Sequence, residues 1–298
     1  MRVSTNHMVE GSLLGVRSSF ERFVKAQEKA STGKQLSKPS DDPPAVAKAL
    51  SLQSTLDTID QWQRNIDDAN AFLGTVDSAL DQAQTLIRQA RTLGIQAATD
   101  GVSVDSRFAL ANQVTSIINQ LGAVGNTTYR SRYVFAGQQT RQSPFIGSVG
   151  GGFTYRGGTA ATADADLVVS IGLNERMVIN ATGDKVFHQA FSALSALRDN
   201  IANNQIKAIS DQDLSAMDEA LNIISGYRAE VGSKVQALNQ AKQRLEQTHI
   251  TVQEQLSTLV DADLPKTFID LQNAERAYQA ALVAAAKGFQ QSLLDFLR

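Results

Sequence analysis

The side chains best suited to chemistry in this chain are three histidines and one pair of adjacent aspartates. His7, His188 and His249 lie in different segments, and none has a second histidine at the spacing of a metal site. Asp41–Asp42 could act as a carboxylate pair, but their position directly before two prolines is typical of a helix start, where aspartate caps free N–H groups. The sequence therefore predicts structural roles for these residues, with none of them catalytic.

Two further segments have residue types that bind ligands in other proteins. Gly150–Gly152 does not fit the pattern G-x-G-x-x-G, and the Lys-Ser/Thr that follows a phosphate-binding loop is missing, so a turn is expected. Asp164 and Asp166 could bind calcium, but the glutamate at the twelfth position of a calcium loop is missing, which favours an exposed loop. We therefore expect a protein that is not an enzyme and that needs neither cofactor nor metal.

Composition excludes several partners and chemistries. Lys and Arg total 28 against 30 Asp and Glu, and a formal charge of −2 is too balanced to supply the basic field that binds nucleic acid. The absence of cysteine excludes disulfides and thiolate nucleophiles.

The ends of the sequence do not resemble membrane segments. Glu10 and Glu21 interrupt the first 25 residues, which contain no continuous apolar stretch. The longest charge-free apolar run near the C-terminus, Ala277–Ala286, is about half a membrane span. We expect neither a Sec-type signal peptide nor a transmembrane helix, and no membrane insertion.

A sustained seven-residue repeat predicts two long helices of coiled-coil type. The first begins after the prolines at 43–44 and ends near Thr99, and the second returns through residues 217–259. The residues that we expect to form the core of this rod are Leu52, Ile59, Trp62, Ile66, Leu73, Leu80, Ile87, Ile224, Val231, Leu238, Leu245 and Val252. Because two rods flank one insertion, the chain should run out, form a head and return antiparallel.

The insertion has the features of strands. Between residues 127 and 182, short runs of aromatic and β-branched residues at 133–135, 153–155, 167–171 and 177–179 alternate with glycine-rich turns. We expect a mainly α, elongated protein with a small β-rich insertion. It would divide into a terminal domain (1–38 with 263–298), a rod domain (39–140 with 186–262) and a β-rich head (141–185).

Both ends of the chain are amphipathic helices in this interpretation. One apolar stripe near each terminus would make contacts within and between subunits, because a lone helix of this length cannot bury its stripe. The residues expected to form these contacts are Leu13, Val16, Phe20, Phe23, Leu264, Phe268, Leu271, Tyr278, Leu282, Phe289 and Phe296. We expect the two termini to pair with each other.

The segment Lys29–Pro43, KASTGKQLSKPSDDP, resembles the N-terminal signature of the bacterial flagellin family. In that signature a Ser-Thr-Gly turn ends one helix and an Asp-Asp pair starts the next, which suits a left-handed Gly33 and a capping aspartate. The stretch Asp263–Arg298 is similar to the terminal helix of the family. The resemblance covers both ends and both rods, and implies a flagellin-like rod with paired termini.

Three details resemble the branch of the family that lies between hook and filament rather than the filament branch. They are the opening Met1–Asn6, the form Pro39–Pro43, and the run Tyr133–Gly137. The resemblance implies export through the flagellar type III apparatus after binding an export chaperone, and an extracellular location in the flagellum. The implied partners are the preceding hook-associated protein, flagellin and other copies of this chain in a ring.

Two other interpretations remain open at this point. The chain could be a short filament flagellin, or a soluble coiled-coil scaffold unrelated to motility, because a heptad repeat predicts packing without identifying the partner. For the terminal stripes we expect coupled folding and assembly, in which they are exposed or disordered in a monomer and become helical when buried in the polymer.

Overall fold

The computed structural model describes residues 2–99, 102–148, 152–157 and 166–296, with side chains from residue 10 to residue 287 within these ranges. The helices are α1 (Arg2–Thr32), α2 (Pro43–Ala97), α3 (Val104–Gly125), α4 (Gly183–Ala202), α5 (Ile206–Ala208), the π-helix η2 (Ile209–Asp213), α6 (Leu214–Val260) and α7 (Leu264–Phe296). The strands are β1 (Thr128–Tyr129), β2 (Arg132–Tyr133), β3 (Phe145–Gly147), β4 (Phe153–Tyr155), β5 (Val168–Gly172) and β6 (Glu175–Val178).

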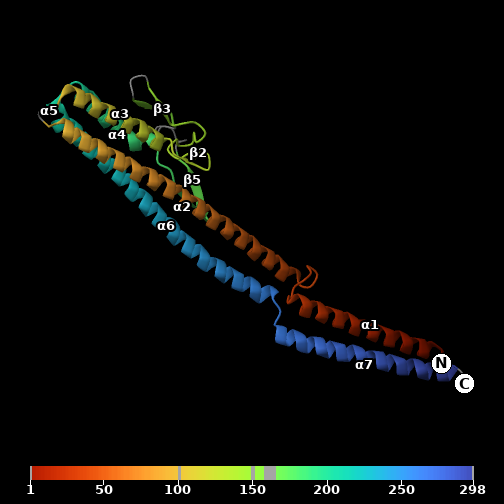
Figure 1. Ribbon diagram of the computed structural model, residues 1–298. Coiled ribbons are helices and arrows are strands. Elements are labelled where there is room, and N and C mark those ends of the chain that lie inside the picture. The colour runs from red at the N-terminus through yellow and green to blue at the C-terminus, as the bar shows by residue number, and fades with distance from the viewer. Residues whose placement is uncertain (1, 100–101, 149–151, 158–165, 297–298) are drawn as a thin grey trace. The chain divides into compact units, whose positions relative to one another are not determined.

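The described chain falls into two compact units (Figure 1). One unit combines the residues up to Thr58 with those from Gln247 onward, and the other is Ile59–Glu246. The expected mainly α fold with a small β-rich insertion is confirmed. The division into three functional domains stays a prediction.

In the unit Ile59–Glu246, α2 and α6 run antiparallel along each other. Their cross-helix hydrogen bonds show this directly: Asn70 bonds to Asn239, Gln84 to Ser225 and Arg91 to Asp218. The residue number on α6 falls as the residue number on α2 rises. All three contacts pair residues whose numbers add up to the same value. The two helices therefore keep one register over this stretch.

Most residues expected to form the rod core are buried in the structure. The buried ones are Ile59, Ile66, Leu73, Leu80, Ile87, Ile224, Val231 and Leu238, and Leu52, Trp62, Leu245 and Val252 are half-buried. Helices α3 and α4 pack against each other and contribute to the same apolar core. The repeat thus marks a seam shared by α2 and α6.

The strands form three separate antiparallel hairpins, β1–β2, β3–β4 and β5–β6. Strands β4, β5 and β6 lie where the sequence predicted strands, and β3 was not predicted. The expected strand at 133–135 was wrong beyond Tyr133, because Val134 and Phe135 are buried in a turn, and the Phe135 carbonyl accepts the N–H of Gly183. Strands also begin before the predicted head, at Thr128.

An aromatic cluster joins the β3–β4 hairpin and the turn at Phe135 to α4. Phe187 on α4 packs edge-on against both Phe135 and Phe145, with ring centroids 4.9 and 5.6 Å apart. Phe191, one turn further along α4, lies 5.2 Å from Phe145 and 5.3 Å from Phe153. The β3–β4 hairpin is therefore held to α4 by burial of aromatic rings, which is favourable in such tilted geometries.

Two glycines give opposite predictions for stability. A Cβ on Gly122 would overlap the ring of Phe153, whereas one on Gly226 would meet nothing within 4 Å. We expect Gly122→Ala to lower the free energy of unfolding by about 1–3 kcal/mol through overpacking, and Gly226→Ala to raise it by up to about 1 kcal/mol through helix propensity. Urea unfolding followed by circular dichroism measures both. Adding Phe153→Leu to Gly122→Ala should recover part of the loss, and no recovery would contradict the proposed overlap.

Candidate assembly surface

The terminal helices α1 and α7 pair antiparallel within their own unit. The ring of Tyr278 contacts both Phe20 and Phe23, at centroid distances of 5.4 and 6.0 Å. At the other end of the pair, the Gly33 carbonyl accepts the N–H of Ala262 at 2.8 Å. The expected pairing of the two termini is therefore present in a single chain.

Small side chains line the contact between the two helices. Ser19, Thr267 and Ala285 are buried there, at 6, 8 and 7% exposure. Other residues at the same helical positions are half-buried, namely Val16, Phe23, Ala26, Leu271, Ala274, Tyr278 and Ala281. Each helix therefore uses one narrow stripe to contact the other, as in a two-stranded coiled coil.

A second set of large apolar side chains remains exposed beside this contact. Leu13, Phe20 and Val24 on α1 are 53, 46 and 42% exposed. Leu264, Phe268 and Leu282 on α7 are 46, 53 and 43% exposed. On α1 the three residues are seven and four apart, and on α7 Phe268 and Leu282 are fourteen apart, so each set lies along one side of its helix, with polar residues such as Glu275 between Phe268 and Leu282. We call the six residues together the terminal apolar face.

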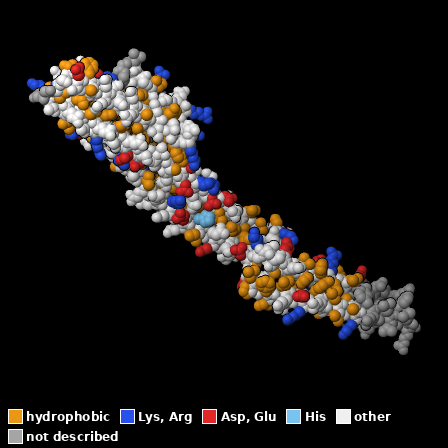
Figure 2. Space-filling model, in the orientation of Figure 1, with side chains coloured by type: hydrophobic (Ala, Val, Ile, Leu, Met, Phe, Trp, Pro, Cys, Tyr) orange, Lys and Arg blue, Asp and Glu red, His pale blue; other side chains and the backbone are white. Residues whose placement is uncertain are grey.

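The two stripes lie on the same side of the helix pair. At about 100° per residue, Leu13, Phe20 and Val24 are rotated by about 80–120° from the contact stripe of α1, and Phe268 and Leu282 by about 60–100° from that of α7, both in the direction of increasing residue number. Leu264 lies seven residues before Leu271 and continues the contact stripe of α7 at the start of the helix. Because the helices are antiparallel, rotations of this kind point to one side of the pair. Figure 2 shows hydrophobic side chains gathered on the terminal helices. The terminal apolar face is thus two helices wide and lies beside the α1–α7 contact.

Each residue that the sequence singled out for assembly can now be placed. Leu13, Phe20, Leu264, Phe268 and Leu282 are exposed, and Val16, Phe23, Leu271 and Tyr278 are half-buried at the α1–α7 contact. Phe289 and Phe296 lie outside the residues whose side chains are described. Their roles in contacts between subunits stay predictions.

Sequence reasoning missed several exposed apolar residues of the terminal helices. Val24 belongs to the terminal apolar face, and its spacing of four from Phe20 could have identified it. Leu14, Ile269 and Val283, at 65, 60 and 57% exposure, lie on the opposite side of their helices from the α1–α7 contact. They have no seven-residue repeat with the stripe residues, so the search for one stripe passed over them.

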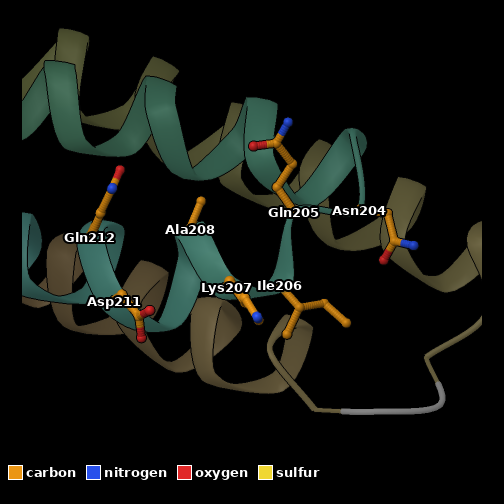
Figure 3. Close-up of a pocket in the computed structure, with 7 residues that line it drawn as sticks. All are labelled: Asn204, Gln205, Ile206, Lys207, Ala208, Asp211 and Gln212. Carbon is orange, nitrogen blue, oxygen red and sulfur yellow. The ribbon is translucent and has the colours of Figure 1, made fainter.

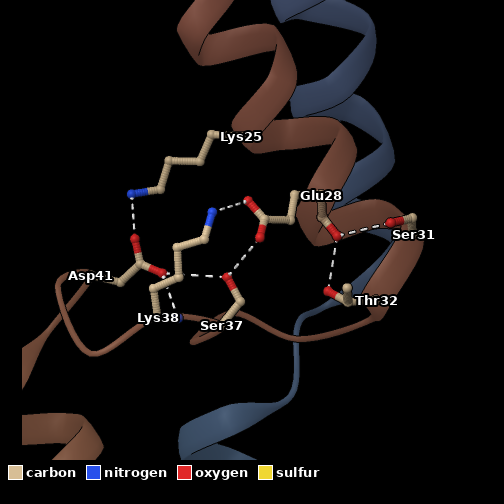
Figure 4. A network of polar contacts seen from close by, with 7 residues as sticks. All are labelled: Lys25, Glu28, Ser31, Thr32, Ser37, Lys38 and Asp41. Carbon is tan, nitrogen blue, oxygen red and sulfur yellow. Dashed lines mark hydrogen bonds and ion pairs between the residues drawn. The ribbon is translucent and has the colours of Figure 1, made fainter.

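The loop between α1 and α2 is fixed by a polar network (Figure 4). Gly33 ends α1 in the left-handed conformation, at φ 68°, and Asp42 caps α2 by accepting the N–H of Ala45, so both of these expectations are confirmed. Lys38 pairs with Glu28 at 3.0 Å, which ties the loop back to α1.

Asp41 is the centre of this network. Its carboxylate accepts from the Lys25 ammonium at 2.7 Å and from the N–H of Lys38 at 3.2 Å. The hydrogen bond from Lys25 and those from the loop backbone stabilise the ionised form, which lowers the pKa of Asp41 from 3.8 to about 2. The two aspartates therefore have different roles: Asp42 caps α2, and Asp41 stabilises the loop.

The histidines, aspartates and glycines considered as candidates for catalysis or ligand binding do not form a reactive site in the described structure. His188 is exposed and lies 3.8 Å from Asp184, and the side chain of His7 is outside the described ones. Asp164 also lies outside the described residues, as do Gly150 and Gly151. Among the residues that the structure describes, no group of three His, Asp or Glu side chains could hold a metal ion.

The hollows of the described surface are open, and their linings bring together no group of side chains arranged for catalysis. One of about 520 Å³ is lined by the short turn Asn204–Gln212, where η2 begins (Figure 3). Asp213, the last residue of η2, is buried and accepts from Asn200 at 2.8 Å, and burial raises the pKa of that carboxyl. None of the described helices combines the length and the apolar character needed to cross a bilayer.

Comparison with known proteins identifies the family. Residues 3–140 match the bacterial flagellin N-terminal helical region, and residues 214–297 match the bacterial flagellin C-terminal helical region. The chain belongs to the bacterial flagellin family. The matched regions contain the terminal apolar face, the loop network and both long helices.

Relatives within the flagellin family differ in how closely they match. Flagellar hook-associated protein 3 of Salmonella typhimurium is 28% identical over 97% of this chain and 96% of its own length. A flagellin of Bacillus subtilis is 23% identical over the full length of both chains. A solved structure of a putative flagellar hook-associated protein from Vibrio parahaemolyticus shares the fold, with a TM-score of 0.64 and 19% identity over 74% of this chain and 100% of its own.

The pKa of Asp41 predicts a pH dependence for the loop. Because the pKa is lowered on folding, the stabilisation is complete above about pH 4 and is lost as the pH falls towards 2. Asp41→Asn should therefore lower the melting temperature at pH 6 and have a much smaller effect near pH 2, as measured by thermal unfolding at a series of pH values. Asp57→Asn, at an exposed position of α2, serves as the control. An equal loss at both pH values would contradict the assignment.

Proposed function

We propose that this protein is a structural adaptor of the bacterial flagellum, which joins the hook-associated ring to the flagellin filament. The observation that carries the proposal is the terminal apolar face, because a protein that works alone has no use for a two-helix-wide apolar surface. The match to hook-associated protein 3 is higher in identity than the match to flagellin at similar coverage, which favours a junction role over a filament role.

Burial of the terminal apolar face would supply the assembly energy. Its six side chains are each about half exposed, and burying the rest of them is worth on the order of 5 kcal/mol or more before the costs of association. The six members are aromatic or aliphatic, and Arg17 and Glu275 lie between them at the same helical spacing, so the face suits contact with helices that alternate apolar and charged side chains. We expect such helices in other copies of this chain and in neighbouring axial proteins.

The proposed partners are the hook-associated protein on the hook side, flagellin on the filament side, and further copies of this chain in a ring. In this proposal an export chaperone binds the chain, and the type III export apparatus delivers it to the distal end of the flagellum. The protein acts by packing, and its described side chains offer no group arranged for catalysis. Its terminal residues, including Phe289 and Phe296, would lie in the axial core.

We also propose that folding of the terminal helices is coupled to assembly. Among the described helices, α1 packs mainly on α7, and a pair of helices with one shared stripe is marginally stable on its own. Amide hydrogen exchange on the monomer should show weak protection in both terminal helices and strong protection in α2 and α6 of the other unit. Equal protection in all four would contradict coupled folding.

The main prediction concerns polar substitutions on the terminal apolar face. Phe20→Ser combined with Leu282→Ser should leave the monomer folded, because both side chains are about half exposed, but should prevent assembly by removing apolar contact area. Electron microscopy of cells that lack this chain should show hooks without filaments, with flagellin released into the medium. The double variant should not restore filaments.

The matched control is Leu173→Ser, at the most exposed of the large hydrophobic side chains described outside the terminal helices, with 82% exposure. It should restore filaments as well as the wild type does. If the Phe20→Ser/Leu282→Ser variant restores filaments, the proposed role of the face is wrong. If cells lacking the chain still form filaments on their hooks, the junction role is wrong, and a short filament flagellin or a scaffold unrelated to motility becomes the better account.

A further inference from the structure

The apolar seam between α2 and α6 does not by itself fix how the two helices align. On α2 the fully buried seam positions are Ile66, Leu73, Leu80 and Ile87, and on α6 they are Met217, Ile224 and Leu238, with Val231 nearly so. A slide of seven residues would replace each of these by a residue of similar size. Heptad repeats of this uniformity therefore permit several registers of nearly equal packing, and polar groups usually select one.

One polar cluster spans this seam and contacts three residues of α2 that lie one turn apart. Arg228 on α6 donates to Asp77 at 2.9 Å, to Asp81 at 2.7 Å and to Gln84 at 2.9 Å. Gln84 is only 5% exposed, and its amide donates to the hydroxyl of Ser225 at 2.7 Å. The cluster thus provides hydrogen-bond partners for the buried amide of Gln84. It also lets one guanidinium bind three acceptors that are four and three residues apart on α2.

Neither register shifted by seven residues reproduces these contacts. One slide would bring Arg228 opposite Gln84, Arg88 and Arg91, which places like charges together. The other slide would bring it opposite Asn70, Gly74 and Asp77, where a single carboxylate remains. In both cases Gln84 loses Ser225, and an unpaired buried amide is unfavourable.

The exposed ion pairs between the helices distinguish the observed register from the shifted ones less strongly than the Arg228 cluster does. Lys242 binds Asp67 at 2.7 Å, but a slide in one direction would give it Asp60 instead. Arg91 and Asp218 pair at 2.8 Å with 38 and 52% of their side chains exposed, and solvent-exposed pairs contribute little. In the cluster around Arg228, the bonds to Asp77 and to the buried Gln84 are partly buried, so they are the stronger determinant, whereas the bond to Asp81 is as exposed as the Arg91 pair.

We propose that Arg228, Asp77, Asp81, Gln84 and Ser225 form a register clamp that selects one alignment of α2 and α6. A slide of seven residues moves one helix by about 10 Å along the other. Gly94 of α2 would then lose its place against Leu197 and Leu214, whose side chains approach it closely in this register. The clamp acts within a single chain and does not depend on the flagellar role proposed above.

The absence of cysteine makes a direct test possible. Asn70→Cys with Asn239→Cys reports the observed register, because these two side chains face each other. Asn70→Cys with Gly232→Cys or with Glu246→Cys reports the two registers shifted by seven residues. Disulfide yield in the purified monomer under a mild oxidant measures each register in the full-length chain.

With the clamp intact, we expect only the 70–239 disulfide. In the Gln84→Leu/Arg228→Leu background, the ratio of shifted to observed disulfide should rise at least about tenfold, because charge-assisted hydrogen bonds that favour one register are lost. The matched control is Arg91→Leu/Asp218→Leu, which removes an exposed cross-helix pair and should leave the ratio unchanged. A clamp variant that forms only the 70–239 disulfide would overturn the proposal.

If the double leucine variant loses its helical circular dichroism, Arg228→Lys decides the question. Lysine keeps the charge but cannot bind three acceptors in the geometry of a guanidinium, so shifted disulfides should increase by a smaller factor. An Arg228→Lys chain with the same disulfide pattern as the wild type would then refute the clamp.

Discussion

The constraint on which this structure depends is that two helices can cover only one stripe of each other. Ser19, Thr267 and Ala285 show where α1 and α7 meet, and the contact leaves Phe20, Phe268 and Leu282 about half in water. A third layer of helices is the simplest way to cover such residues, and other copies of a flagellin-family chain can supply it. The terminal helices thus pair with each other but leave apolar surface uncovered, which is the property that a polymerising subunit requires.

The unit formed by Ile59–Glu246, in contrast, buries its apolar surface within one chain. Its long helices bury their apolar seam within one chain, and α3, α4 and the hairpins cover the remaining sides at one end. Apolar burial supplies most of the favourable free energy, but repeats of Ile and Leu cannot distinguish between registers. The cluster around Arg228 adds the specificity that the seam lacks. Stability and alignment therefore come from different residues of the same two helices.

The sequence predicted the helices better than the hairpins for a physical reason. A repeat that persists over several heptads is strong evidence for a helix, and α2 and α6 begin and end within a few residues of the expected bounds. Strand β3 has three residues after a proline, which is too short for a periodic pattern, and Phe135 is buried by aromatic packing in a turn. Amphipathicity predicted that the terminal stripes need partners, but it could not separate Phe23, which faces α7, from Phe20, which largely faces solvent. That distinction, like the register of α2 on α6, depends on contacts between residues far apart in the chain.

The account is tested most directly by the solvent accessibility of the terminal apolar face before and after assembly. Phe20→Cys and Leu282→Cys each place the only thiol of the chain on this face, and Leu173→Cys places one on a hairpin. The account predicts that a thiol reagent labels all three variants in the monomer, and in isolated flagella labels only the hairpin variant. Equal labelling of positions 20 and 282 in monomers and in flagella would contradict it.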